Sequence, residues 1–247
     1  MSIETLVQQA DLSSTAFNKE NFDEVVMSTY GRFPIALEKG LGCRLWDTEG
    51  KEYLDFVAGI ATCTLGHAHP KIIEAVTQQI QKIQHVSNLY YIPEQGELAR
   101  WIVDNSCADK VFFCNSGAEA NEAAIKLARK YAHTVLDIDN PIVLTANASF
   151  HGRTLATITA TGQPKYQKNF NPLVPGFNYV PYNDIDAVEA AIGELDEGNY
   201  AVGAIMLEPL QGEGGIRPGD VKYFQKLRSI CDETGILLIF DEVQVGM

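Results

Sequence analysis

The hydrophobic pattern in the second half of the chain alternates between two kinds of segment. Short, largely apolar runs predict strands at 110–116, 141–144, 201–207 and 236–240. Segments with apolar residues at helical spacing lie between them, at 118–130, 184–192 and 221–234. Because strands and helices alternate, we expect an α/β fold with a mostly parallel sheet and helices on both faces. The run 236–240 has no polar break, which predicts a strand covered on both faces.

The first part of the chain has a different pattern. Residues 1 to about 28 are polar and aperiodic, which is typical of an arm. Residues 44–46 and 52–56 alternate between polar and apolar around the turn signal at 47–50, and this predicts a β-hairpin. We therefore expect 1–65 to form an N-terminal arm with a small β-containing segment, and 66–247 to form a larger domain.

Pro70 opens a further predicted helix, since proline suits the first helical turn. Apolar side chains recur on one face of this helix, so we expect that face to belong to a core. They are Ile72, Ile73, Val76, Ile80 and Ile83. His67 and His69 precede the helix, but no third ligand stands near them in the sequence, so we expect no metal site.

The composition narrows the classes of function. The 247 residues carry a formal net charge of −13, and an acidic surface repels the phosphates of nucleic acid. No stretch approaches the roughly 18 apolar residues of a membrane span, and the N-terminus lacks the pattern of a secretion signal. The five cysteines form no C-x-x-C pair, which is typical of free thiols in a reducing compartment. We expect a cytoplasmic protein that binds neither nucleic acid nor membrane.

Candidate binding residues follow the predicted strands. The turn Ser116-Gly117-Ala118 leads from the strand 110–116 into the helix 118–130. Backbone amides at the start of a helix bind phosphate well, and the hydroxyl of Ser116 can add a hydrogen bond. The alternative is that Ser116 is only the N-cap of the helix, which is a common arrangement.

Acidic residues follow the two longest apolar runs. Glu208 comes after 201–207, and Asp241 comes after 236–240. A buried carboxylate needs a partner, and for Asp241 that partner is either a ligand or the neighbouring backbone amides. Glu213 lies in the Gly-rich loop after Glu208, but this loop lacks the lysine and hydroxyl residue of a P-loop.

An aromatic and a basic residue follow the strand 141–144. Phe150 and Arg153 flank Gly152, and an arginine can clamp a carboxylate with two hydrogen bonds. A surface arginine in a turn is the alternative for Arg153. Ends of parallel strands meet along one edge of a sheet, so these groups are expected together there. Pyridoxal phosphate would use all of them, because an ionised acid such as Asp241 keeps its pyridine nitrogen protonated.

Six stretches resemble the class III pyridoxal-phosphate-dependent aminotransferases. They are Leu65-Gly-His-Ala-His-Pro70, Ser87-Asn-Leu-Tyr-Tyr91, Asn115-Ser-Gly-Ala-Glu-Ala-Asn121, Ser149-Phe-His-Gly-Arg-Thr154, Glu208-Pro-Leu-Gln-Gly-Glu-Gly-Gly-Ile216 and Asp241-Glu-Val-Gln244. The resemblance implies a fold type I large domain, pyridoxal 5'-phosphate as cofactor, and a homodimer with sites at its interface. It also implies transfer of the ω-amino group of N-acetylornithine to 2-oxoglutarate, a step of arginine biosynthesis.

The resemblance implies roles for single residues. Those implied to hold the cofactor are Ser116, Gly117, Ala118, Phe150, Asp241, Glu242, Val243 and Gln244. Those implied to bind substrate are Arg153, Glu213 and Tyr30. Asp241 is implied to be catalytic, Arg153 to take the α-carboxylate, and Glu213 to pair with a downstream arginine and to move when the second substrate binds.

The sequence departs from the family at one essential position. The family's Schiff-base lysine follows the motif that begins at Asp241, and this sequence has no lysine after Lys226. We therefore expect an N-terminal portion of an aminotransferase that is inactive by itself. Ornithine, 4-aminobutyrate and succinyl-diaminopimelate stay open as alternative amino donors. A non-catalytic fragment that binds pyridoxal phosphate, or only dimerises, is the alternative from another class.

Overall fold

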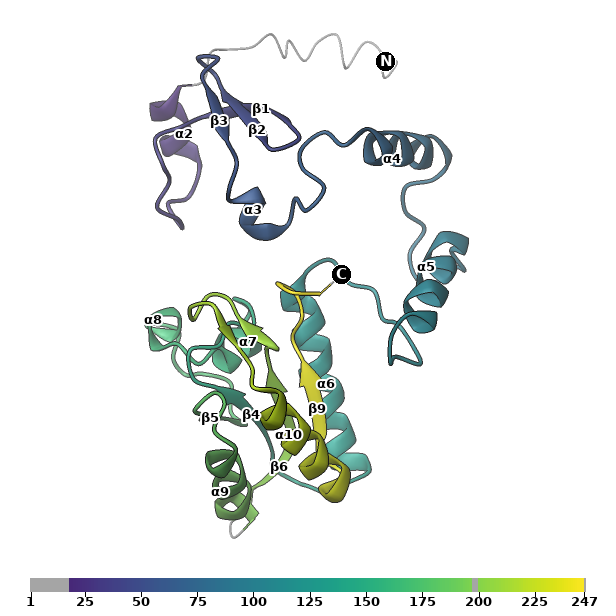
Figure 1. Cartoon of the computed structure of the whole chain (residues 1–247), viewed down its shortest axis with the longest axis vertical. Helices are drawn as coiled ribbons and strands as arrows, with labels where there is room; N and C mark the ends of the chain where they lie inside the picture. Colours follow the sequence, from purple (N-terminus) through teal and green to yellow (C-terminus); the bar gives the residue numbers. More distant parts are fainter. Residues whose placement is uncertain (1–17, 197–199, 247) are drawn as a thin grey trace. The chain divides into compact units, whose positions relative to one another are not determined.

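The structure is a computed structural model that describes residues 18–196 and 200–246. Most of the predicted N-terminal arm, 1–17, lies outside the described residues. The chain divides into two compact units, 1–92 and 93–247, which are shown in Figure 1 and are described one at a time.

The second unit is built on a four-stranded parallel sheet. Its strands are β4 (Pro141–Ala146), β5 (Phe177–Val180), β6 (Ala201–Leu207) and β9 (Leu237–Phe240). Their order across the sheet is β5-β4-β6-β9, and every neighbouring pair is parallel. This confirms the α/β fold with a parallel sheet that the alternating pattern predicts.

Helices cover both faces of this sheet (Figure 1). The helices and the short hairpin strands of the unit are α5 (Pro93–Asp104), α6 (Gly117–Thr134), α7 (Leu155–Ala160), α8 (Pro164–Gln167), α9 (Ile185–Asp196), α10 (Val221–Thr234), β7 (Leu210–Gln211) and β8 (Arg217–Pro218). Successive strand residues point to opposite faces. In β6, Ile205 therefore joins the core with α9 and α10, and Met206 joins the core with α6 and α7.

Two predicted strands differ from the expectation. Residues 110–116 carry no strand, although α6 begins directly after them, as expected. The apolar run 236–240 does form β9, but β9 is the last strand of the sheet and its side chains are only partly buried, with Phe240 43% exposed. The apolar run predicts the strand correctly, but among the described residues no further strand covers its outer edge.

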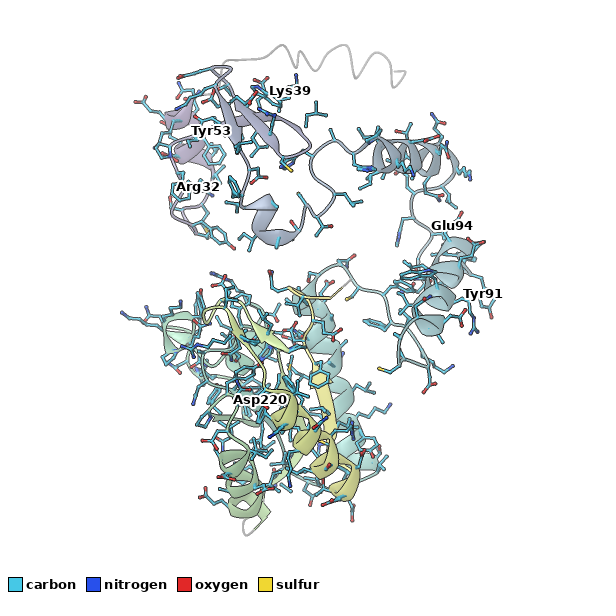
Figure 2. All side chains as sticks on the ribbon, in the orientation of Figure 1. Arg32, Lys39, Tyr53, Tyr91, Glu94 and Asp220 are labelled. Atoms are coloured by element: carbon cyan, nitrogen blue, oxygen red, sulfur yellow. The ribbon has the colours of Figure 1, made fainter. Side chains whose placement is uncertain are left out.

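The first unit contains a small antiparallel sheet. Its elements are α2 (Lys19–Val25), β1 (Leu37–Leu41), β2 (Arg44–Asp47), β3 (Glu52–Leu54), α3 (Ala58–Ala61) and α4 (Pro70–Lys82). The predicted hairpin is confirmed as β2 and β3. Its turn is held by Asp47, whose carboxylate accepts hydrogen bonds from the Lys51 amide and the Tyr53 hydroxyl. Figure 2 shows Lys39 and Tyr53 on this sheet, where the Lys39 ammonium lies 5.2 Å from the centre of the Trp46 ring.

The apolar face of α4 is exposed, contrary to the core position that its spacing predicts. Ile73 is 54% exposed, and α4 has no buried residue. The same unit exposes Phe33, Phe56 and Tyr91, the last of which is labelled in Figure 2. The spacing gives the correct helix, but in this unit no described element packs over the face.

His67 has a structural partner. Its Nε2 lies 2.7 Å from the Asp55 carboxylate, which also accepts the backbone amides of Val57 and Ala58. Across the described ranges, no three His, Cys, Asp or Glu side chains are grouped closely enough to hold a metal ion. No helix in the same ranges has the length and apolar character needed to cross a membrane.

Candidate active site

Three segments that follow strands meet in the second unit, and two of them, after β4 and β9, pack against the start of α6, with Asp241 between them. Asp241 follows β9 and is 7% exposed. Its Oδ2 accepts hydrogen bonds from Asn121 Nδ2 and from His151 Nδ1, both at 2.8 Å. Its Oδ1 accepts the Val243 amide at 3.1 Å. Oδ2 is therefore occupied by two side-chain donors, whereas Oδ1 keeps acceptor capacity for a further donor.

The surroundings of Asp241 keep it ionised. Burial alone would raise the pKa of this carboxyl, because it disfavours the charged form. The hydrogen bond and the charge of His151 act in the opposite direction, as do the hydrogen bonds from Val243 and Asn121, and together they hold the pKa of Asp241 below its usual value. The site therefore contains a buried negative charge at neutral pH.

His151 is fixed in one tautomer by the same bond. An ionised carboxylate can only accept, so His151 Nδ1 carries the hydrogen that points at Asp241. Its Nε2 is buried and has no hydrogen-bond partner among the described residues. His151 therefore supports Asp241 as a hydrogen-bond donor through Nδ1. No role was predicted for His151 or Asn121, because they come close to Asp241 only in the folded chain.

The start of α6 is packed against two of these segments. A Cβ on Gly117 would lie 2.7 Å from the Val243 side chain. Gly152 has φ +133°, and a Cβ there would lie 2.9 Å from the Ala118 side chain. Both glycines are needed for this close approach. Ser116 is the N-cap of α6, since its Oγ accepts a hydrogen bond from the Glu119 amide at 3.2 Å. Its hydroxyl therefore has the capping role that was the alternative to phosphate binding.

Glu208 connects the end of β6 to the Phe150 loop. Its Oε2 accepts the Phe150 amide at 3.2 Å, and the side chain is buried. Burial is the main reason that the pKa of Glu208 is raised to about 8, and the nearby charges of Asp241 and Glu213 raise it further. The pKa values of two carboxyl groups at adjacent strand ends are thus shifted in opposite directions. Asp241 is ionised and Glu208 is protonated at neutral pH.

Arg153, Glu213 and Phe150 are joined by a residue that the sequence analysis did not single out. Tyr166, in α8, lies with its ring centre 4.9 Å from the Arg153 guanidinium carbon and 5.6 Å from the Phe150 ring centre. Its hydroxyl donates to Glu213 Oε2 at 3.3 Å. The sequence offers only a weak signal for it, namely a tyrosine in an aromatic-rich loop.

The remaining predicted residues, Glu242, Gln244 and Tyr30, have exposed side chains. Glu242 and Gln244 lie in the exposed turn that follows Asp241. Tyr30 belongs to the first unit, where its side chain is exposed, and its assignment to the substrate stays a prediction.

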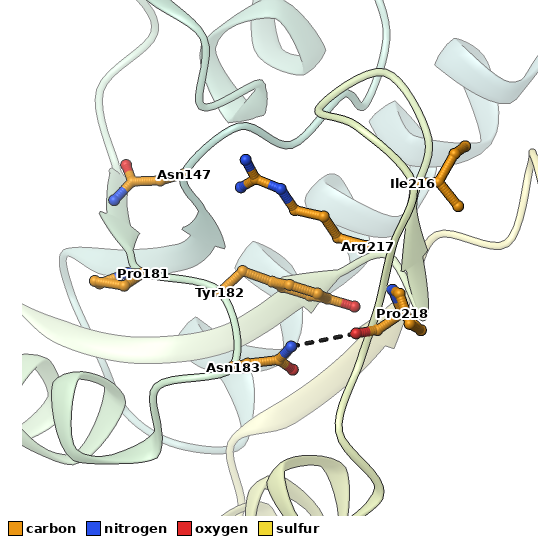
Figure 3. A pocket seen from close by; sticks show the side chains of 7 residues that line it. All are labelled: Asn147, Pro181, Tyr182, Asn183, Ile216, Arg217 and Pro218. Carbon is orange, nitrogen blue, oxygen red and sulfur yellow. Dashed lines mark hydrogen bonds between the residues drawn. The ribbon is translucent and has the colours of Figure 1, made fainter.

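A separate pocket of about 500 Å³ lies beside Tyr182 and the strand β8 (Figure 3). Asn183 Nδ2 donates to the Pro218 carbonyl at 3.2 Å, as the dashed line in Figure 3 marks, and the Tyr182 hydroxyl donates to the Glu208 carbonyl at 2.8 Å. These polar groups are used to hold the β7–β8 hairpin on the sheet, so they are not directed at a ligand.

Comparisons with known proteins point to one family. Residues 25–247 match the model for aminotransferase class III. An acetylornithine aminotransferase of Nostoc is 77% identical over 100% of this chain and 60% of its own length, and one of Synechocystis is 73% identical over 96% of this chain and 56% of its own.

Solved structures agree with the sequence comparison. The ornithine aminotransferase of Toxoplasma gondii has a TM-score of 0.85 at 32% identity, covering 100% of this chain and 57% of that one. The N-acetylornithine aminotransferase of Stenotrophomonas maltophilia has a TM-score of 0.72 at 39% identity, covering 88% and 52%. The chain thus spans 53–60% of the length of the curated relatives it matches. The extent of the match, from residue 25 to residue 247, shows that the chain belongs to the class III aminotransferase family.

Proposed function

We propose that this chain forms the cofactor-binding part of a pyridoxal-phosphate-dependent aminotransferase that moves the ω-amino group of N-acetylornithine to 2-oxoglutarate. The observation that carries the proposal is Asp241. It is a buried, ionised carboxylate with two side-chain donors on Oδ2 and remaining acceptor capacity on Oδ1. Such a group suits a cationic N–H, which is what a protonated pyridine nitrogen presents.

The neighbouring residues fit the rest of this cofactor. Gly117 and Ala118 begin α6, where amides without a partner inside the helix attract phosphate. Phe150 supplies an aromatic face and is held by Glu208 through its backbone amide. When bound, pyridoxal phosphate supplies an electron sink for the substrate carbon. The residues of this chain would hold its phosphate, orient its ring and keep its ring nitrogen protonated.

The substrate assignment rests on Arg153 and on the relatives. Arg153 is exposed, and its guanidinium lies over the Tyr166 ring. A guanidinium can bind an α-carboxylate through two parallel hydrogen bonds. The 77% identity to the Nostoc acetylornithine aminotransferase favours acetylornithine as amino donor over ornithine, since the ornithine aminotransferases of Toxoplasma gondii and Plasmodium falciparum are 32% and 30% identical. The alternative donors 4-aminobutyrate and succinyl-diaminopimelate have no specific support in these observations.

We further propose that this chain is inactive by itself. The sequence has no lysine after Lys226, and the nucleophile that forms the covalent link to the cofactor in this family would have to come from residues outside it. We also propose a homodimer, supported by the exposed apolar face of α4, and a cytoplasmic location, supported by five unpaired cysteines.

One experiment tests this function. The 247-residue chain and the full-length protein are each incubated with pyridoxal phosphate, reduced with borohydride, and assayed with acetylornithine and 2-oxoglutarate. We expect stable labelling and glutamate formation with the full-length protein only. A full-length protein that forms no glutamate from acetylornithine would overturn the substrate assignment. Activity of the 247-residue chain would contradict the need for an external lysine.

A further inference from the structure

Tyr166 contacts three residues to which the proposed function gives a role. Its ring faces the Arg153 guanidinium at 4.9 Å and meets the edge of Phe150 at 5.6 Å with the two ring planes 75° apart. Its hydroxyl donates to Glu213 Oε2 at 3.3 Å. Phe150 and Arg153 follow β4, and Glu213 lies in the loop between β7 and β8, so one side chain joins residues from two separate loops.

We propose that Tyr166 is a positioning residue, whose ring holds the Arg153 guanidinium in place for a substrate carboxylate and whose hydroxyl holds Glu213 beside it. This inference rests on the proposed function for the identity of the substrate. The contact between Tyr166 and Arg153, however, is testable without it.

The backbone at Tyr166 is held firmly, as a positioning residue requires. The Tyr166 amide donates to the Gln163 carbonyl at 3.0 Å, and Gln163 Nε2 donates to the Ser149 carbonyl at 2.8 Å. The next residue, Gln167, donates from Nε2 to the Thr161 carbonyl at 2.8 Å. The bond to Ser149 fixes the start of α8 to the loop that carries Phe150 and Arg153, and the bond to Thr161 fixes its end to the end of α7.

The charges around the ring suit its proposed task. The negative face of an aromatic ring attracts cations, and the Lys165 ammonium also lies within 4.6 Å of the Tyr166 ring centre. The ring thus gathers two positive groups beside the Glu213 carboxylate. The attraction to the ring uses the flat face of the guanidinium, so this contact itself does not use the edge through which an arginine binds a carboxylate.

Two variants of Tyr166 separate the ring from the hydroxyl, and Tyr223→Phe is the matched control. Tyr166→Phe keeps the ring, and Tyr166→Leu removes it. The control removes a hydroxyl that is buried without a partner among the described residues, so it should change neither readout. The protein is the full-length form with its cofactor.

The first readout is the Nε–Hε resonance of Arg153, assigned with an Arg153→Lys variant. In the wild type and in Tyr166→Phe, the ring should shift this proton upfield, and in Tyr166→Leu the shift should be lost. The second readout is kinetic. Tyr166→Leu should raise the KM for acetylornithine about tenfold with little change in kcat, as loss of a partly desolvated cation–π contact implies.

The hydroxyl is tested with Glu213. The effect of Tyr166→Phe on the KM for 2-oxoglutarate should disappear in a Glu213→Gln background, because the two groups act through one bond. An unchanged Arg153 resonance in Tyr166→Leu would overturn the inference, as would equal effects of the Phe and Leu variants. A wild type without transaminase activity would instead overturn the proposed function, and the Arg153 resonance would still decide whether the ring holds the guanidinium.

Discussion

The two units of this chain bury their apolar side chains to very different extents. In the second unit, Ile205 of β6 is completely buried between helices, and the polar residues at the strand ends form a connected cluster. In the first unit, the isoleucines of α4 have regular helical spacing, yet Ile73 is 54% exposed. Periodicity therefore specifies which side of an element is apolar, whereas burial depends on whether another element covers that side.

The largest effect is expected when an isoleucine is shortened to alanine in each unit. Ile205→Ala should lower the free energy of unfolding by about 2–5 kcal/mol, because it leaves a cavity in a packed core. Ile73→Ala should change it by no more than about 0.5 kcal/mol, since an exposed side chain has little packing to lose. Urea unfolding at low protein concentration measures both. A large loss in Ile73→Ala, present only at concentrations where the protein dimerises, would indicate that a second copy covers α4.

Between pH 5 and pH 8, the pH dependence of stability should belong to the second unit. The pKa of Glu208 is raised from 4.5 to about 8 in the folded protein, chiefly by burial. The folded state therefore binds a proton that the unfolded state has lost, and this stabilisation is complete below pH 4.5 and disappears as the pH rises through about 8.

Glu208→Gln removes this titration while keeping the shape of the protonated acid. The fall in unfolding free energy between pH 5 and pH 8, measured by urea unfolding, should become shallower in the variant. Equal slopes in the wild type and in Glu208→Gln would contradict a protonated Glu208 in the folded state.

The smallest expected effects come from the helix N-caps. Asp220, which is labelled in Figure 2, accepts a hydrogen bond from the Lys222 amide at the start of α10. This helix contributes Leu227 to the core. Asn18 accepts the Glu20 amide at the start of α2, which has no buried residue. Asp220→Ala should cost about 1 kcal/mol of unfolding free energy. Asn18→Ala should leave thermal unfolding unchanged, because α2 can fray without exposing a core, and a comparable loss there would show that α2 is packed.

Much of the second unit could be predicted from sequence because its signals are local. The apolar runs predicted β4, β6 and β9, and Asp220 and Gly235 marked the two ends of α10. The strand 110–116 was wrong, since a short apolar run is compatible with extended chain that pairs with nothing. The edge position of β9 was missed for a related reason, because the residues of a strand do not specify how many strands pair with it.

Most residues of the candidate site could be predicted from the sequence, but the hydrogen bonds and contacts between them could not. Strand ends drew attention to Asp241, Glu208, Phe150 and Arg153, and the helix start to Gly117. The partners of Asp241 are separated from it by 120 residues for Asn121 and by 90 for His151, and nothing local in the sequence relates them. Tyr166 was missed because α8 has only four residues, which is too short for a periodic pattern to mark one of its side chains.

The central claim is that Asp241 keeps the pyridine nitrogen of the cofactor protonated. The most direct measurement is the ¹⁵N chemical shift of ¹⁵N-labelled pyridoxal phosphate bound to the full-length protein. It is compared with Asp241→Asn and with the control Asp55→Asn, which alters a partly buried Asp–His pair in the first unit, at His67. We predict a protonated nitrogen in the wild type and in Asp55→Asn, and an unprotonated one in Asp241→Asn. An unprotonated nitrogen in the wild type, or no difference between the wild type and Asp241→Asn, would contradict the account.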